Sequence, residues 1–255
     1  MLRLFFSFLV GSGILAGNLF AQNSESNVKI EADKIYNDGN GLLKSGNNSA
    51  AIQKYRQAIT LYKDDFKYHY QLGLALKNDR QLEQAIESFK YALALKADLA
   101  IANNALGGVY LYLRKYDEAI AAFTLALEKD KSLSQAKAGL AESYAGRGQE
   151  LLNNGKFDQA VSLLVQASTQ YTDNSKIYLV LASAYNKMDQ PKDAIETALN
   201  AIKHKKKGSK GAEYFELGIA FKKLGIMDKA REAFNEAKKD ANYARNAQYE
   251  LDGLK

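Results

Sequence analysis

The sequence of 255 residues contains no cysteine, a single proline and only two histidines. Without cysteine, disulfides, thiolate metal sites, cysteine nucleophiles and cysteine lipid anchors are all excluded. Proline interrupts a helix because it removes an N–H donor and clashes with the preceding turn. The near absence of proline, in a chain rich in Ala, Leu, Lys and Glu, therefore predicts an all-helical protein.

Groups that could build an active site are equally scarce. Neither His69 nor His204 belongs to a His/Asp/Glu cluster with metal-ligand spacing, and no Gly-Lys-Ser/Thr phosphate-binding loop occurs. An active site needs several convergent groups with shifted pKa values in one pocket. We therefore expect a protein that is not an enzyme, with no catalytic residues, no metal site and no cofactor.

The N-terminus has the layout of a secretory signal peptide. One cation, Arg3, precedes apolar residues 4–10 and 14–16, and polar residues follow Ala21. We predict cleavage after Ala21, which gives a signal peptide at 1–21, a polar linker at 22–29, and an exported protein of the bacterial periplasm or cell envelope, or a secreted one. The alternative is an uncleaved membrane anchor, although the run is interrupted by glycines and close to the minimum length for a bilayer.

A sequence pattern of about 34 residues occurs six times in the rest of the chain. Each copy has Gly or another small residue near its eighth position, and alanine at its twentieth and twenty-seventh. Small residues let two antiparallel helices approach, and large residues at the seventh, eleventh and twenty-fourth positions fill the space between them. One hairpin cannot bury its own apolar face, so it stacks on the next. The twentieth positions are Ala51, Ala85, Ala119, Ala160, Ala194 and Ala230.

This pattern resembles the tetratricopeptide repeat (TPR), over nearly all of the chain after the signal segment. The resemblance implies an all-α fold: a right-handed α-solenoid superhelix of six helix-turn-helix repeats, whose first helices (A helices) line a concave groove. The TPR domain is expected at 30–240, followed by a C-terminal capping helix and tail at 241–255, because Ala237, Ala241, Ala244, Ala247 and Leu251 form one apolar stripe. The repeats are expected at about 32–65, 66–99, 100–133, 134–174, 175–208 and 211–244.

Two departures from the family pattern carry expectations of their own. The proline near position 32 is missing, which predicts longer or less sharply ended second helices (B helices). The fourth copy is seven residues too long, and seven residues are close to two helical turns, so the apolar stripe stays in phase. The spacing of Gly148, Gly155 and Ala160 repeats the spacing of the first copy. We predict one long A helix over about 134–153.

The resemblance also implies which residues face the groove, namely positions 2, 5, 9, 12 and 13 of each A helix. Aromatic residues there could anchor an apolar side chain, and amides could bond a peptide backbone. The implied function is a non-enzymatic scaffold or adaptor that binds a partner protein as a peptide or helix. The other interpretation, that some of these residues only pack between repeats, stays open. The candidates are Tyr36, Asn40, Tyr70, Leu74, Asn104, Tyr112, Leu179, Phe215 and Ile219.

A basic run follows the fifth copy: Lys203, Lys205, Lys206, Lys207 and Lys210. It suggests an alternative function, binding of an anionic surface or polyanion such as lipid headgroups or an acidic partner. The run also fits a solvated helix C-terminus, where cations suit the helix dipole. Despite a pI near 9.1 we expect no nucleic acid, because the chain has an export signal and no interleaving of arginine with aromatic residues. Membrane contact is expected only through an uncleaved signal or this run.

Overall fold

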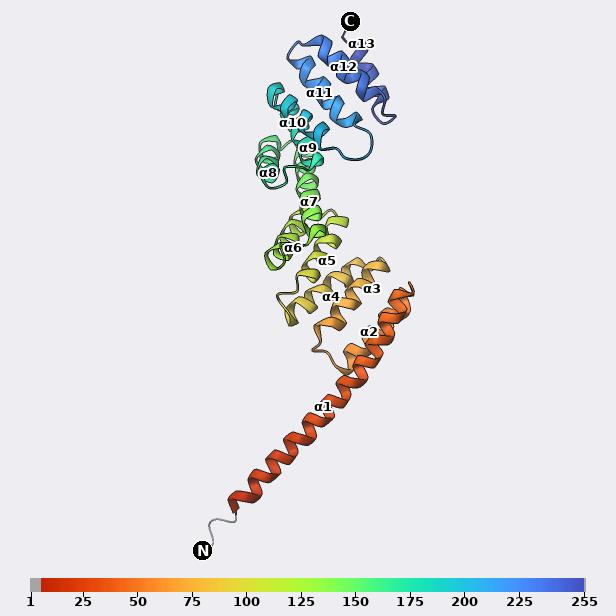
Figure 1. Cartoon of the computed structure of the whole chain (residues 1–255), viewed down its shortest axis with the longest axis vertical. Coiled ribbons are helices and arrows are strands. Elements are labelled where there is room, and N and C mark those ends of the chain that lie inside the picture. Colours follow the sequence, from red (N-terminus) through yellow and green to blue (C-terminus); the bar gives the residue numbers. More distant parts are fainter. Residues whose placement is uncertain (1–5, 255) are drawn as a thin grey trace. The chain divides into compact units, whose positions relative to one another are not determined.

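The computed structural model describes the backbone of residues 6–254 and the side chains of residues 25–254. Within that range all regular structure is helical, which confirms the all-α prediction (Figure 1). The helices are α1 (Phe6–Lys44), α2 (Asn48–Leu61), α3 (Phe66–Asn78), α4 (Leu82–Leu95), α5 (Ala100–Tyr112), α6 (Tyr116–Lys129), α7 (Ser134–Asn153), α8 (Phe157–Gln170), α9 (Ser175–Lys187), α10 (Pro191–His204), α11 (Gly211–Lys223), α12 (Met227–Lys238) and α13 (Ala244–Asp252).

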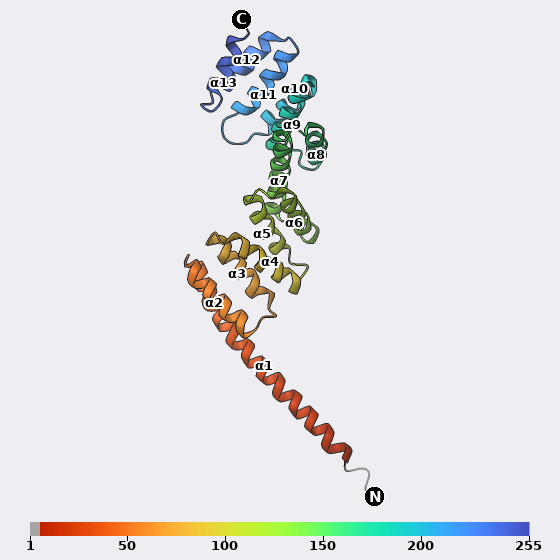
Figure 2. The same cartoon turned by 180° about the vertical axis from the view of Figure 1, so that it is seen from behind.

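The helices form two compact units, which are described separately. The first comprises Met1–Val109 and Glu128–Lys131, and the second comprises Tyr110–Leu127 and Ser132–Lys255. In the first unit α1 packs on α2, α2 on α3 and α3 on α4. In the second, each helix from α7 to α12 packs on its successor (Figure 2). This order of A and B helices is the one that the repeats predict.

Every turn from an A helix to a B helix contains one residue in a left-handed conformation, five residues before the alanine of position 20 and thus at position 15 when the insertion of the fourth repeat is left out of the count. Glycine supplies it three times, with φ of 83°, 72° and 73° at Gly46, Gly155 and Gly225. The other three turns use Arg80, Arg114 and Asp189, with φ of 61°, 57° and 58°. Since glycine alone adopts this conformation without steric cost, the three non-glycine turns carry strain.

The eighth and twenty-fourth positions meet inside the first and sixth hairpins. A Cβ atom on Gly39 would lie 2.8 Å from the ring of Tyr55, and one on Gly218 would lie 2.6 Å from the ring of Phe234. Both rings are fully buried. A hydrogen at position 8 therefore leaves the space that the large residue at position 24 fills.

The long helix of the fourth repeat is confirmed, since α7 spans Ser134–Asn153. It uses both registers that the sequence contains. Near its N-terminus, a Cβ atom on Gly139 would meet the ring of Phe123 on α6 at 2.3 Å. Near its C-terminus, a Cβ atom on Gly148 would meet Leu164 on α8 at 2.7 Å. The second register makes the hairpin of the fourth repeat, and the first contacts the preceding B helix.

The expectation of longer or less sharply ended B helices is wrong. All of α2, α4, α6, α8 and α10 have 14 residues and end two residues before the position of the missing proline. At the end of α2, the backbone of Tyr62 turns to an extended conformation while its N–H still donates to the carbonyl of Ala58. Lys96 ends α4 in the same way. The following polar turn therefore stops these helices without proline.

At the N-terminus α1 has 39 residues and extends well past α2 (Figure 1). Residues 22–29, predicted as a linker, are helical and belong to α1. Residues 1–5 of the predicted signal peptide lie outside the described range, and its cleavage stays a prediction. Within the described part of the chain, none of the helices combines the length and the apolar character that a bilayer crossing requires.

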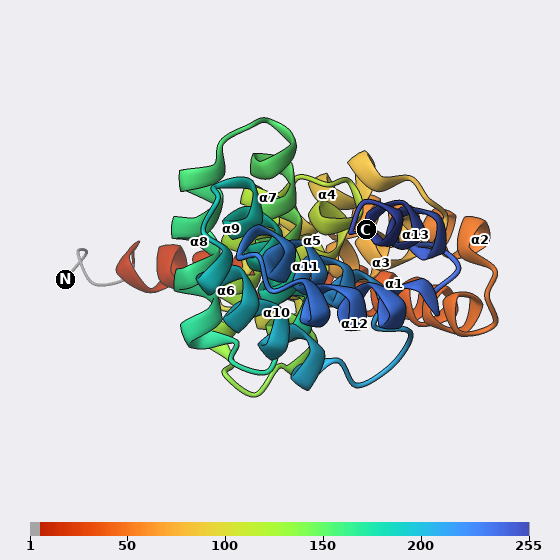
Figure 3. The same ribbon diagram turned by 90° about the horizontal axis from the view of Figure 1, so that it is seen from above.

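At the C-terminus the predicted single stripe is wrong, although a capping helix is present. α12 ends at Lys238, and Ala241 lies exposed in the turn that leads to α13. Ala247 and Leu254 are the residues of this end that are buried, and α13 packs on α12 (Figure 3). The turn arises where Asp240 Oδ1 accepts a hydrogen bond from the N–H of Asn242 at 2.9 Å.

Candidate binding surfaces

The candidates of the first repeat take part in packing. The ring centroid of Tyr36 lies 5.8 Å from that of Tyr55 and 5.0 Å from that of Tyr68. Asn40 accepts a hydrogen bond from the hydroxyl of Tyr55 at 2.8 Å. Both candidates are half-buried. Their A-helix position is therefore used at least in part to hold the first hairpin together.

A polar cluster joins the start of this hairpin to α3. The hydroxyl of Tyr68 donates to Asp33 at 2.6 Å, and Lys29 Nζ lies 3.2 Å from Asp33 and 3.1 Å from Asp65. The hydrogen bond from Tyr68, followed by the charge of Lys29, lowers the pKa of Asp33. Burial first, and then Asp33, raises the pKa of the Tyr68 phenol. The cluster stabilises the fold and offers no free catalytic group.

The remaining candidates of the first unit lie on α3 and α5. The ring of Tyr70 lies 5.9 Å from that of Phe89, and burial raises the pKa of its phenol. Leu74 and Asn104 are half-buried. Of these three side chains, Tyr70 thus packs against another ring.

In the second unit the candidates differ in exposure. Tyr112, at the end of α5, is 67% exposed. Leu179 on α9 is half-buried. Phe215 packs with centroid distances of 5.7 Å to both Phe234 and Tyr243, and Ile219 joins the same apolar cluster. Tyr112 is thus the candidate best placed to contact a partner.

A buried amide connects α9 to α11. Asn186 is 6% exposed, and its Nδ2 donates to the backbone oxygen of Glu216 at 2.9 Å and to Glu216 Oε2 at 2.7 Å. Lys223 Nζ donates to the backbone oxygen of Asn186 at 2.7 Å and to Asp189 at 2.8 Å. Burial raises the pKa of Glu216, against the hydrogen bonds from Asn186 and Ser183. The sequence shows no sign of this network, because its members are ordinary polar residues of two A helices and of the turn after α9.

The basic run is less free than its sequence suggests. Lys205 Nζ lies 2.7 Å from Glu213 Oε1, and Glu213 is only 1% exposed. Lys206 lies 3.2 Å from Asp173. Lys203, Lys207 and Lys210 make no ion pair with a described residue. Lys205 is therefore a structural residue, and a cationic patch would depend on the other lysines.

Three hollows lie at equivalent positions of different repeats, on the side of the A helix opposite the candidate groove positions. With 3.6 residues per turn, positions 4, 7 and 11 project about opposite to positions 5, 9 and 12. The second repeat has a hollow of about 360 Å³ over Leu72 and Leu76. The fifth has one of about 270 Å³ over Tyr178, Leu181 and Tyr185. We call the latter the repeat-five furrow.

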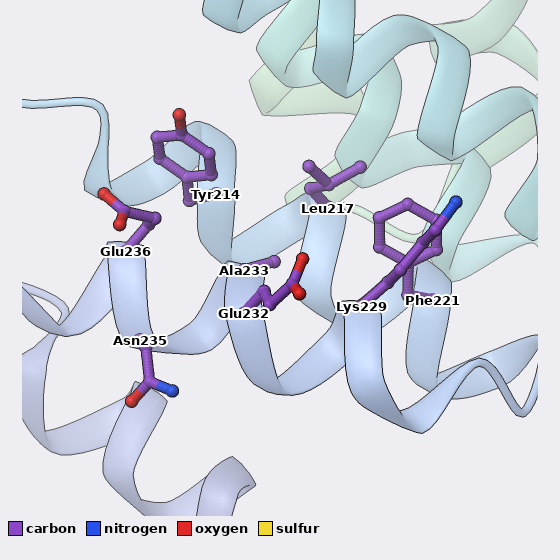
Figure 4. A pocket seen from close by; sticks show the side chains of 8 residues that line it. All are labelled: Tyr214, Leu217, Phe221, Lys229, Glu232, Ala233, Asn235 and Glu236. Carbon is purple, nitrogen blue, oxygen red and sulfur yellow. The ribbon is translucent and has the colours of Figure 1, made fainter.

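The sixth repeat has the largest of these hollows, about 620 Å³, which we call the repeat-six furrow. Its floor is Tyr214, Leu217 and Phe221 of α11, and its rim comes from α12 (Figure 4). Lys229 runs along the floor and places its Nζ 5.6 Å from the ring centroid of Phe221. Glu232 and Glu236 complete the rim. The furrow thus brings a cation, an aromatic ring and carboxylates together.

No cluster of three or more His, Asp or Glu side chains suited to a metal ion occurs among the described residues. The pKa shifts described above arise in packing networks and do not converge in a hollow with a nucleophile. What the surfaces offer is apolar and aromatic area bordered by polar groups, which is the chemistry of macromolecular recognition.

Sequence models of the TPR repeat match residues 39–79, and models of the tetratricopeptide repeat match 70–134 and 151–212. The Hsp70-Hsp90 organising protein of Plasmodium falciparum is 26% identical over 158 residues, covering 52% of this chain and 28% of that protein. The CTR9 homolog of Arabidopsis thaliana is 26% identical over 221 residues, covering 84% of this chain and 20% of that protein. The chain thus spans less than a third of the length of these two relatives.

Solved structures share the fold. PilF of Pseudomonas aeruginosa has a TM-score of 0.55 at 19% identity, covering 89% of this chain and 99% of that chain. YrrB, a TPR protein with an unusual peptide-binding site, has a TM-score of 0.53 at 18% identity, covering 76% and 97%. With the repeated hairpins, the position-15 turns and the matched repeat models, the chain belongs to the tetratricopeptide-repeat family.

Proposed function

We propose that this protein is a non-enzymatic interaction scaffold of the cell envelope, which binds a partner protein as a peptide or helix along the A helices of its repeats. The observation that carries the proposal is the set of exposed apolar residues on an A helix. On α5, Ile101 at position 2 is 43% exposed and Tyr112 at position 13 is 67% exposed. Exposed aromatic residues of this kind are common anchors of protein interfaces.

Two further observations support the proposal. A TPR relative is named as an organising protein for two other proteins, although this chain covers only 28% of its length. The signal-like segment before residue 22 supports export to the envelope.

The test is capture of partners from an envelope extract with the wild-type chain and the variant Ile101→Ser/Tyr112→Ala. We expect the variant to lose a specific partner by about tenfold, since truncating one anchor typically costs more than 1 kcal/mol. Tyr70 is unsuitable for this test because its ring packs on Phe89. Tyr249→Ala is the matched control, since Tyr249 is 77% exposed on α13 and is not a candidate. Equal capture by all three proteins would show that the A-helix candidates do not bind the partner.

The alternative, a polyanion binder acting through the basic run, has weaker support. Two of its five lysines are held in ion pairs, one of them to a buried carboxylate. A direct test is sedimentation with anionic vesicles of the variant Lys203→Gln/Lys207→Gln, which leaves the Lys205–Glu213 pair intact. Salt-sensitive binding that this variant loses would favour the alternative over the scaffold.

A further inference from the structure

The repeat-five and repeat-six furrows are built alike at positions 4, 7, 11 and 22, and they differ in charge at positions 19 and 26. Both place aromatic rings at positions 4 and 11 of the A helix, with leucine between them at position 7. Both carry a glutamate at position 22 of the B helix, Glu196 and Glu232. Position 19 is lysine in one and aspartate in the other, namely Lys229 and Asp193.

In the repeat-six furrow, Lys229 is the cation that the site contains. Its Nζ lies 5.6 Å from the centroid of Phe221, and Glu232 belongs to the same rim (Figure 4). A cation over an aromatic face is attracted by the ring quadrupole, and a neighbouring carboxylate adds to the attraction. The furrow of the sixth repeat thus supplies its own positive charge.

In the repeat-five furrow that positive charge is missing. None of the described residues that line it is Lys, Arg or His, and Asp193 stands where the sixth repeat has lysine. Asp193 and Glu196 are exposed and make no ion pair with a described residue. Burial raises the pKa of the Tyr185 phenol, and the charges of Asp193 and Glu196, which line the same hollow, raise it further.

We propose that the repeat-five furrow is a second docking site, which receives a lysine or arginine side chain of a partner protein between Tyr178, Tyr185 and the carboxylates of Asp193 and Glu196. The aliphatic stem packs on Leu181 and the rings, and the charged end reaches the carboxylates. The volume of about 270 Å³ suits one long side chain. The occupant is cationic because both unpaired charges of the lining are negative.

This site is separate from the proposed A-helix surface. Its residues occupy positions 4, 7 and 11 of α9, which project about opposite to position 5, where the candidate Leu179 lies. A partner could therefore be bound by one surface in the absence of the other, and failure of one proposal leaves the other standing.

The test is a reciprocal exchange at position 19, followed by 1H–15N NMR during titration with N-acetyl-arginine amide. The full chain is used, in which His204 stacks on Tyr178 with a centroid distance of 5.8 Å. In the wild type we expect saturable shifts of the amides of Tyr185, Asp193 and Glu196, with a dissociation constant on the order of millimolar. N-acetyl-citrulline amide, which has the same shape without the charge, should leave these signals in place.

Asp193→Lys gives the fifth repeat the internal cation of the sixth, and should weaken the binding there by about fivefold or more. Lys229→Asp removes the internal cation of the sixth repeat and should create new shifts at Tyr214 and Phe221. Both positions are exposed, so both variants should fold, which a thermal melt would check. Equal binding by the wild type and Asp193→Lys, equal binding of the citrulline amide, or no saturable shift in the wild type would overturn the proposal.

Discussion

Gly73 packs so closely against Phe89 that a Cβ atom on the glycine would lie 2.6 Å from Cε1 of the ring. Phe89 is fully buried, so the ring has no free space into which it can move. The contact joins position 8 of an A helix to position 24 of its own B helix, and it recurs through the chain. It explains why a residue that weakens helices persists in the middle of α3.

Gly73→Ala should therefore destabilise the protein by about 1–3 kcal/mol, the usual cost of overpacking a core. Urea unfolding followed by circular dichroism would measure the change. Gly41→Ala in α1 is the control, because its Cβ atom would meet nothing within 4 Å. That variant should gain about 0.5–1 kcal/mol from its better helix propensity. If both substitutions had the same sign, the packing explanation would be wrong.

Arg80→Gly and Arg114→Gly should each stabilise the protein. Both arginines hold the left-handed turn conformation, with φ of 61° and 57°, that other repeats assign to glycine. Relief of that strain exceeds the extra flexibility of glycine in the unfolded chain, and we expect a gain of about 0.5–1 kcal/mol each. The reverse change, Gly46→Ala, should cost about 1 kcal/mol. Melting temperatures of the three variants would measure these changes in stability. A loss of stability in both arginine variants would contradict the explanation by backbone strain.

Lys205→Met should destabilise the protein by about 3–5 kcal/mol, because it leaves the buried carboxylate of Glu213 without its ion pair. Lys207→Met, two residues on and exposed, should change stability by less than about 0.5 kcal/mol. Adding Glu213→Gln to the first variant should recover part of the loss, since a neutral amide is cheaper to bury than a charge. Chemical denaturation of the three variants would measure their free energies of unfolding, and so the contribution of the Lys205–Glu213 ion pair to stability.

The stability contributed by Asp33 should depend on pH in a defined direction. Its pKa is lowered in the folded state, chiefly by the hydroxyl of Tyr68. Its contribution is therefore complete above the unfolded pKa and is lost as the pH falls through the folded one. Asp33→Asn should cost about 1 kcal/mol or less at neutral pH, because Asp33 is partly exposed, and nothing at the acid end. A cost that stayed constant with pH would exclude this linkage.

Glu216 should behave in the opposite way, because burial raises its pKa. The charged form is then disfavoured in the folded state, so stability falls as the pH rises from the unfolded towards the folded pKa. Glu216→Gln keeps an acceptor for Asn186 and should raise the melting temperature at neutral pH. The gain should shrink as the pH falls below the unfolded pKa of the carboxyl. A variant less stable than the wild type at neutral pH would refute this account.

The sequence was sufficient to predict the helices, because the small residues at positions 8, 20 and 27 recur with a period that only paired helices explain. It also predicted α7, since two in-phase copies of the same spacing occur there. The C-terminal stripe was misjudged because an apolar period of 3.6 cannot reveal the turn at Asp240, where a local side-chain hydrogen bond interrupts the helix. Helix ends depend on such local bonds and are less visible than helix faces.

The candidate groove residues were harder to judge, because the position of a residue on a helix does not decide what it touches. Tyr36 and Phe215 have the expected positions, yet their rings contact neighbouring tyrosine and phenylalanine rings. The furrows were missed for a related reason. The furrows depend on which residue of the B helix lies over which ring of the A helix. The residue at position 19 does not indicate a furrow in the sequence, because its neighbours are known only once the two helices are paired.

Because α7 contacts α6 through one end and α8 through the other, it belongs to two hairpins at once. In a stack of repeats, a chain pulled from its ends can come apart one hairpin at a time. Unfolding of one hairpin at a time cannot halt within α7. Once α8 has detached, half of α7 has lost the helix against which it packs. Under tension, α6, α7 and α8 should therefore unfold together in one step that releases more chain than a single hairpin.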